Sequence, residues 1–216
     1  MSFIGSTLYK KISERYPNKN TKEFVNKKSI VDLKIHQLLA SGAEHVFVST
    51  DDDTVKNSEN VTYINRPQEF CNNEVNFSFV LKHIFNSLPI EDDQVVIHTS
   101  PCAPLFSRYD ELHSSFKRSN INQVVAHPSI HYYLNNNKLP INFIPGTWHS
   151  SSQNLTQVFL HPWAGTCAPI GDLRETNYVL PLNFDFFNIS QFEAIDIDTK
   201  EEFEIAQLLY KSKLTL

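Results

Sequence analysis

Residues 29–53 read SIVDLKIHQLLASGAEHVFVSTDDD, and this stretch decides the fold class. Its first half places Ile30, Leu33 and Leu38 on one side of a helix. Gly42 then ends the helix, and HVFVST follows as a short apolar strand. A chain that repeats this helix–strand step builds a mostly parallel sheet covered by helices.

The same alternation continues through the first 120 residues. The strand VTYIN precedes a helix over VNFSFVLKHIFNSL, and the strand QVVIHTS precedes a helix that starts at Ser107. In that last helix Asp110 stands at capping-box distance from Ser107. QVVAH reads as a further strand, so the predicted class is α/β with helices on both faces of the sheet.

The regular alternation of helices and strands ends after the strand QVVAH. Residues 130–155 are rich in Asn, Pro, Ser and Tyr, and YYLNNNKLPINF predicts a hairpin. We interpret this segment as a small β insertion that covers a site or pairs with a second subunit. QVFLH and NYVLPLN predict two more strands, and a last strand and helix complete a single domain over residues 1–216.

Composition excludes some classes of protein. With 41% hydrophobic and 20% charged residues the chain is ordinary and globular, and its formal charge of -5 argues against nucleic acid or an anionic membrane as partner. A nucleotide substrate is still compatible with that charge. Three widely spaced cysteines make neither a disulfide framework nor a zinc motif. The first residues lack the features of a signal peptide, and no apolar run approaches the ~20 residues that span a bilayer. We therefore expect a cytoplasmic protein with reduced thiols.

The stretch EAIDIDTKEEFEIAQLL, residues 193–209, carries two aspartates with one isoleucine between them. Asp198 and Glu201 have capping-box spacing before a helical pattern. Asp196 falls in the predicted incoming strand, where it would share one face with Asp198 at roughly 7 Å. Two such carboxylates repel each other unless a cation lies between them. The spacing alone favours a helix cap beside a solvated carboxylate and is also compatible with a metal site.

Polar residues follow four predicted strands, at the sheet edge where α/β proteins bind ligands. They lie in STDDD after Thr50, in TSP from Thr99, in HPWAGT from His161 and in DID itself. Each one alone is also typical of a turn or a helix cap. Taken with the basic loop SERYPNKN, they indicate a phosphorylated ligand and a divalent metal.

The order SERYPNKN, VSTDD, RPQEF, TSP, SQNLTQVF and IDIDTKEEFEIAQLL resembles the acylneuraminate cytidylyltransferase family, which includes CMP-sialic acid synthetase. The resemblance implies a Rossmann-like nucleotidyltransferase fold. It also implies transfer of CMP from CTP to an acidic sugar or a related small anionic acceptor, with release of pyrophosphate, for surface-glycan precursor synthesis. Mg²⁺ is the implied cofactor, and a homodimer that contacts through the insertion is the implied assembly.

The resemblance also implies roles for individual residues. Asp196 and Asp198 match the metal-binding aspartates and, with Lys19, the catalytic set. Arg66 matches a position that contacts cytosine, and Gln153 matches the acceptor side of the pocket. The residues assigned to the nucleotide are Lys10, Ser13, Arg15, Lys19, Asn20, Arg66 and Ser100.

The phosphate loop departs from the family pattern. Lys11 and Ile12 replace two glycines, whose freedom to adopt positive φ lets backbone N–H groups approach a triphosphate. Lys10 replaces an arginine, and Glu14 replaces a lysine. A non-catalytic nucleotide-binding or assembly relative is therefore an alternative to the enzyme.

The acceptor side departs as well. Serine stands in SSSQNL where the family has a basic residue, and Ile97 and His98 replace a Gln-Pro pair. His149, His161 and Arg174 are other residues that could receive an anion, and of these we assign His161 to the substrate. A different nonulosonic acid, a phosphonate or a phosphate ester is an alternative acceptor. A sugar-nucleotide glycosyltransferase, which also uses a D-x-D pair, is a third possibility for the function.

Overall fold

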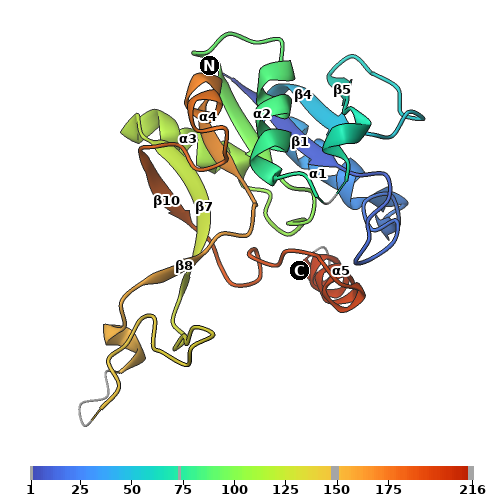
Figure 1. Cartoon of the computed structure of the whole chain (residues 1–216). Coiled ribbons are helices and arrows are strands. Elements are labelled where there is room, and N and C mark those ends of the chain that lie inside the picture. The colour runs from blue at the N-terminus through green and yellow to red at the C-terminus, as the bar shows by residue number, and fades with distance from the viewer. Residues whose placement is uncertain (1, 73, 147–150, 214–216) are drawn as a thin grey trace.

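The computed structural model describes residues 2–72, 74–146 and 151–213. Figure 1 shows one twisted sheet with helices packed against it and a long arm that leaves it at one end. In chain order the elements are β1 (Phe3–Tyr9), β2 (Glu23–Val25), β3 (Lys28–Ser29), α1 (Ile30–Ala40), β4 (Ala43–Thr50), β5 (Val61–Asn65), α2 (Phe77–Ser87), β6 (Val95–Thr99), α3 (Tyr109–Ser119), β7 (Asn122–Ser129), β8 (Val158–Leu160), β9 (Thr166–Pro169), α4 (Ile170–Thr176), β10 (Phe184–Asn188) and α5 (Lys200–Lys213), with 3₁₀ turns at Gln68–Phe70 and Ser152–Asn154.

The strands pair in the order β10-β7-β9-β6-β1-β4-β5. β1 is parallel to both β4 and β6, β4 to β5, and β10 to β7. β9 runs antiparallel between β6 and β7, and β8 pairs antiparallel with β7. The predicted α/β class with a mostly parallel sheet is confirmed.

Alternating side chains divide the sheet between two apolar layers, as the pleat of a strand requires. Phe3, Val46 and Ile97 pack with α1 and α3 in one cluster of buried residues. Ile4 and Phe47, their neighbours in sequence, pack with α2 and α4 in a second cluster. Helices therefore cover both faces of the sheet, as the sequence predicts.

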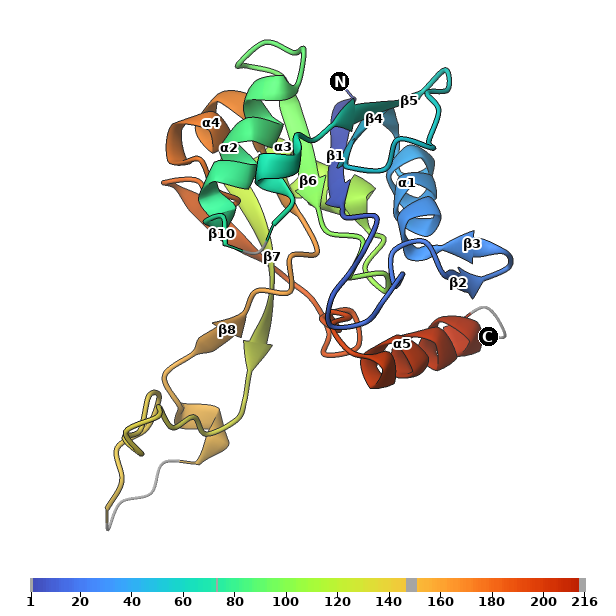
Figure 2. The same ribbon diagram turned by 45° about the vertical axis from the view of Figure 1, so that its right-hand side comes forward.

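The C-terminal helix α5 belongs to neither layer. Its residues Phe203 and Ala206 pack on Phe24 from the β2–β3 hairpin and on Ile30 and Leu33 from α1. Figure 2 shows α5 lying beside this hairpin, below the edge where β1 ends. The first and last parts of the chain are thereby joined next to the loop that follows β1.

The insertion forms the arm. A bridge between Leu134 and Pro140 and the hydrogen bond from Asn135 N–H to the Leu139 carbonyl close the predicted hairpin. β7 and β8 form the base of the arm, which extends away from the sheet in both views (Figures 1 and 2).

Two predicted helix caps are wrong. Thr199, not Asp198, caps α5, because its hydroxyl accepts from Glu202 N–H while the Glu202 carboxylate accepts from Thr199 N–H. α3 begins at Tyr109, and its capping residue Arg108 makes no side-chain cap hydrogen bond. The Arg108 side chain instead pairs with Glu193 on the chain that leads to α5.

Some strands also differ from the prediction. NYVLPLN forms no strand, and the last strand, β10, begins just after it at Phe184. Asp196 lies in irregular chain rather than in a strand, because its neighbour Ile197 bonds to a loop and not to a sheet. β1, β9 and α4 were not predicted, since their short or mixed sequences lack clear periodicity.

Within the described residues, no helix is both long and apolar enough to cross a membrane. Cys71, Cys102 and Cys167 are free thiols.

Phe203 tests the attachment of α5. Its ring is 2% exposed and meets Phe24 edge-on at a centroid distance of 5.2 Å. We expect Phe203→Ala to lower the free energy of unfolding by about 3–5 kcal/mol in urea titrations, because it leaves a cavity in this cluster. Ile205→Ala on the exposed side of α5 is the control. Equal effects of the two substitutions would contradict the docking described here.

Candidate active site

The main pocket lies at the carboxyl edge of the sheet. From β1 the chain moves to β4 and β5 on one side and then to β6 on the other, so the order reverses between β1 and β6. Ligands of open α/β sheets bind at such a switch point, outside the carboxyl ends of the strands. The residues that follow β1 and β6 line a pocket there.

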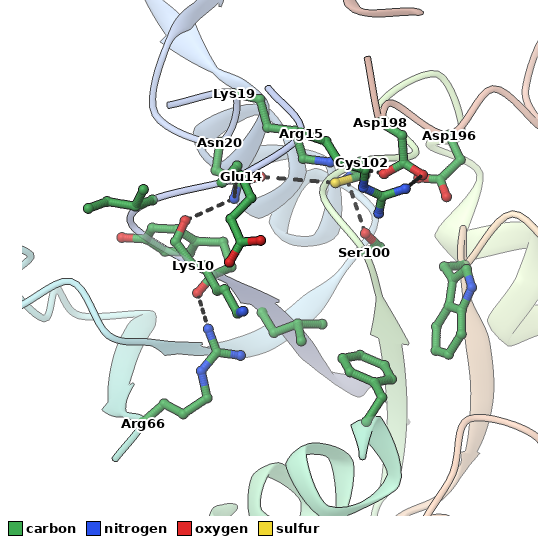
Figure 3. Close-up of a pocket in the computed structure, with 16 residues that line it drawn as sticks. Lys10, Glu14, Arg15, Lys19, Asn20, Arg66, Ser100, Cys102, Asp196 and Asp198 are labelled. Atoms are coloured by element: carbon green, nitrogen blue, oxygen red, sulfur yellow. Dashed lines mark hydrogen bonds and ion pairs between the residues drawn. The ribbon is translucent and has the colours of Figure 1, made fainter. Parts of the chain in front are cut away.

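The pocket has a volume of about 640 Å³, which is in the range of small-molecule sites. Figure 3 shows labelled side chains gathered from the loop after β1, from the residues just after β5 and β6, and from the chain before α5. The lining consists of Leu8, Tyr9, Lys10, Ile12, Ser13, Glu14, Arg15, Lys19, Asn20, Arg66, Phe77, Ser100, Cys102, Trp163, Asp196 and Asp198.

The loop after β1 is held by its own polar side chains. The buried amide of Asn20 donates to the Lys10 carbonyl at 2.9 Å and to the Ser13 hydroxyl at 3.1 Å. Asn18 adopts a φ of 59°, a left-handed conformation that asparagine tolerates well. This turn brings Lys19 and Asn20 back beneath the loop, where both are buried.

Lys11 has a local structural role in the same loop. Its N–H donates to Asp51 at 2.7 Å, and its ammonium contacts Asp52 at 3.1 Å and Asp53 at 2.9 Å. The STDDD segment thus anchors the loop. Neither Lys11 nor Ile12 has a positive φ, so the loop does not use the backbone conformation for which the family has glycine.

The two aspartates of DID point into the pocket because the residue between them points away. Ile197 is fully buried against α5, and its N–H donates to the Cys102 carbonyl at 2.8 Å. Asp198 pairs with Arg15 and, at 3.3 Å, with Lys19. The Lys19 ammonium also donates to the Ile197 carbonyl at 2.5 Å.

Asp196 lies in an unfavourable environment for a carboxylate. Burial and, next in size, the nearby charge of Asp198 together raise its pKa to about 6, while Lys19 opposes the rise. A cation between the two carboxylates would relieve both effects. Mg²⁺ prefers one or two carboxylates together with phosphate oxygens and water, so this donor pair fits that ion.

Arg66 is buried rather than on the surface. It is 3% exposed, and its guanidinium donates to the Tyr9 carbonyl at the end of β1. The Nε atom has no hydrogen-bond partner among the described residues. A buried donor without a partner at the pocket wall is available to a ligand.

The structure brings most of the predicted site together. Every residue assigned to the nucleotide, and both aspartates, line the one pocket. Gln153 is exposed in the arm, and His161 lines a separate small cavity with His98, so their assignment to the acceptor stays a prediction. Arg174 pairs with Asp92, away from this pocket. His149 lies outside the described residues.

Phe77 and Trp163 line the pocket but were not predicted as site residues. Phe77 is the first residue of α2, and Trp163 lies in the HPWAGT segment after β8. The only signal in the sequence was that this segment follows a strand.

A buried lysine, Lys34 of α1, contacts the segment after β6 that also carries the pocket residue Ser100. Its ammonium donates to the carbonyls of Ala103 and Phe106 at 2.8 and 3.1 Å, and it lies 2.6 Å from the Tyr109 hydroxyl. That hydroxyl also contacts the Ala164 carbonyl at 3.2 Å. Lys34 therefore joins α1 to the two loops that carry Ser100 and Trp163.

The stability of the protein should depend on pH through Lys34. Burial lowers its pKa to about 7 from an ordinary value of 10.5. Between these values the unfolded chain binds the proton and the folded chain does not, so the Lys34 contribution to stability rises with pH.

We therefore compare the free energy of unfolding of the wild type with that of Lys34→Met. From pH 7 to 9 the difference between them should change in favour of the wild type by up to about 1.4 kcal/mol per pH unit. Urea titrations at each pH measure the difference. The exposed Lys82→Met is the control, and parallel curves for wild type and Lys34→Met would contradict the assignment.

Comparisons with known proteins agree with this geometry. Residues 12–108 match the sequence profile of a family described as Cytidylyltransferase. No curated protein sequence matches the chain. Among solved structures, a CMP:2-keto-3-deoxy-manno-octonic acid synthetase complexed with CTP superposes with a TM-score of 0.69 at 14% identity, over 99% of this chain and 100% of that one.

Two further structures have the same fold. A 4-diphosphocytidyl-2C-methyl-D-erythritol synthase from Anaerococcus prevotii gives a TM-score of 0.66 at 9% identity, over 97% of this chain and 96% of that one. The 2-C-methyl-D-erythritol 4-phosphate cytidylyltransferase of Francisella tularensis gives 0.68 at 12% identity, over 95% and 99%.

The solved structures share the α/β nucleotidyltransferase fold with this chain, and residues 12–108 are similar in sequence to cytidylyltransferases. These comparisons do not select the acylneuraminate branch.

Proposed function

We propose that the protein transfers CMP from CTP to an acidic sugar or a related small acceptor, with release of pyrophosphate, in the synthesis of a surface-glycan precursor. The observation that carries the proposal is the convergence of Lys19, Arg15, Asp196 and Asp198 on one pocket at the sheet's switch point. The acidic sugar follows from the sequence resemblance to enzymes that activate such sugars.

The loop side of the pocket suits a triphosphate. Lys10, Arg15 and Lys19 come from the loop after β1, and Arg66 follows β5. When an acceptor oxygen attacks the α-phosphorus, negative charge builds on the phosphate oxygens and on the departing pyrophosphate. Fixed cations at this position stabilise that charge and orient the groups for an in-line displacement.

Mg²⁺ fits the pair Asp196 and Asp198, and when bound it would neutralise phosphate charge. The described residues contain no group of three or more His, Cys, Asp or Glu side chains placed to hold a metal. The ion would therefore take its other ligands from phosphates and water. Before it binds, Arg15 and Lys19 neutralise Asp198, and we infer that they turn to the phosphates once CTP arrives.

Calorimetric titration with CTP, in Mg²⁺ and in EDTA, tests the nucleotide half of the reaction. We expect metal-dependent binding of CTP in preference to ATP, GTP and UTP. Lys19→Met should raise the Kd for CTP by about 10–100-fold, because it removes a charged hydrogen-bond donor. Lys22→Met, in the same loop but outside the pocket lining, should leave the Kd unchanged. Absence of CTP binding by the wild type would instead favour a non-catalytic relative.

We also propose that the arm mediates a homodimer. Its described residues expose a run of large apolar side chains, which favours burial against another surface. They are Ile130, Tyr132, Leu134, Leu139, Ile141 and Ile144.

Light scattering coupled to size exclusion tests this assembly. The wild type should elute as a dimer, and the double substitution Leu134→Asp with Ile141→Asp should elute as a monomer, since buried charges are costly. Leu182→Asp, an exposed residue outside the arm, is the control. A monomeric wild type would refute the dimer.

A further inference from the structure

The two sides of the pocket differ in chemistry. The cationic side chains come from the loop after β1 and from the end of β5. Leu8, Phe77 and Trp163 also line the pocket, and none of them carries a charge. A triphosphate needs the cationic side, so the uncharged side is left for the other substrate.

Trp163 is held in place from several directions. Its φ of 56° is unusual for a bulky residue and persists only where the surroundings impose it. Its carbonyl accepts from Ser100 N–H at 2.8 Å. Its indole contacts Phe77, Tyr178 and His161 at centroid distances of 5.4, 5.7 and 5.2 Å. The ring is thus preorganised at the pocket wall.

Phe77 packs edge-on against Trp163 at the pocket wall. The two rings meet at 82°, and Phe77 is 42% exposed although it is large and apolar. It is fixed at the start of α2, where the Asn76 side chain accepts from Ser78 N–H. A rigid apolar ring that faces a pocket and is not covered by the protein favours contact with a ligand.

We propose that Phe77 and Trp163 form the acceptor wall of the pocket and bind the flat C–H face of a sugar ring. This inference rests on the proposed cytidylyl transfer and specifies how its acceptor is recognised. Phe77 and Trp163 are then specificity-determining residues that touch the acceptor and not the triphosphate.

The shape and charge of the wall favour a ring face over other ligands. Tyr178 and His161 pack on Trp163 but are not in the pocket lining. Tyr9, the third aromatic residue of the lining, is buried at the end of β1 with its hydroxyl on Asp52, so this wall presents two aromatic rings to the ligand. A trimethylammonium group is best held by ring faces on several sides. A carboxylate needs a cation, which this wall does not provide, so the acid group of a sugar acid would point toward the loop.

Tryptophan emission tests the placement directly. The sequence has two tryptophans, Trp148 and Trp163, so Trp148→Phe leaves Trp163 as the reporter. In this variant we expect CTP with Mg²⁺ to leave the emission unchanged. Addition of 2-keto-3-deoxy-manno-octonic acid or N-acetylneuraminic acid should then shift or quench it, and phosphocholine should not.

Two results would overturn the proposal. A change in Trp163 emission with CTP alone would show that the wall holds the cytosine base. Pyrophosphate release with one of the sugars, without any change in emission on its addition, would show that the sugar binds elsewhere. Loss of CTP binding in wild-type calorimetry is a separate result, since it refutes the proposed function itself.

A matched pair of substitutions gives a second readout. Phe77→Ala should raise the KM of the sugar acceptor about tenfold or more and leave the Kd for CTP within about twofold. Phe79→Ala removes the same ring from the same helix at an exposed position outside the lining, and it should change neither value. Weaker CTP binding in Phe77→Ala with an unchanged acceptor KM would assign the ring to the nucleotide.

Discussion

The hydrogen bond from Ile197 N–H to the Cys102 carbonyl holds the pocket together. It fastens the chain before α5 to the loop after β6, and the buried Ile197 side chain turns both flanking aspartates toward the opening. Packing of Phe203 on the β2–β3 hairpin keeps this contact in place. The acidic side of the pocket therefore depends on an apolar cluster that touches no ligand.

The fold was predictable where apolar periodicity was strong. The stretch 29–53 gives α1 and β4, with Gly42 at a φ of 94° just past the helix as expected. Prediction failed where structure depends on distant partners. DID has strand-like spacing, yet its backbone forms a hydrogen bond with a loop that is far away in sequence. The short strand β9 depends on pairing with both β6 and β7, which its own sequence does not indicate.

The polar residues of the site were predictable from the sequence, whereas its aromatic residues were not. Charged and polar residues of the phosphate loop could be identified because they occur in an order that resembles a known family, and they do meet in one pocket. Periodicity and charge gave no indication of Phe77, which looks like an ordinary helix residue. The role of Lys34 was equally hidden, because an isolated lysine in an amphipathic helix normally faces solvent.

The placement of α5 has a consequence for when the pocket is completed. A domain folds as a unit, and its N-terminal part is synthesised first. The cationic loop and the sheet edge are made early, whereas Asp196 and Asp198 are made late and are positioned only after α5 docks. The complete pocket would then form in one late step, when the two ends of the chain meet.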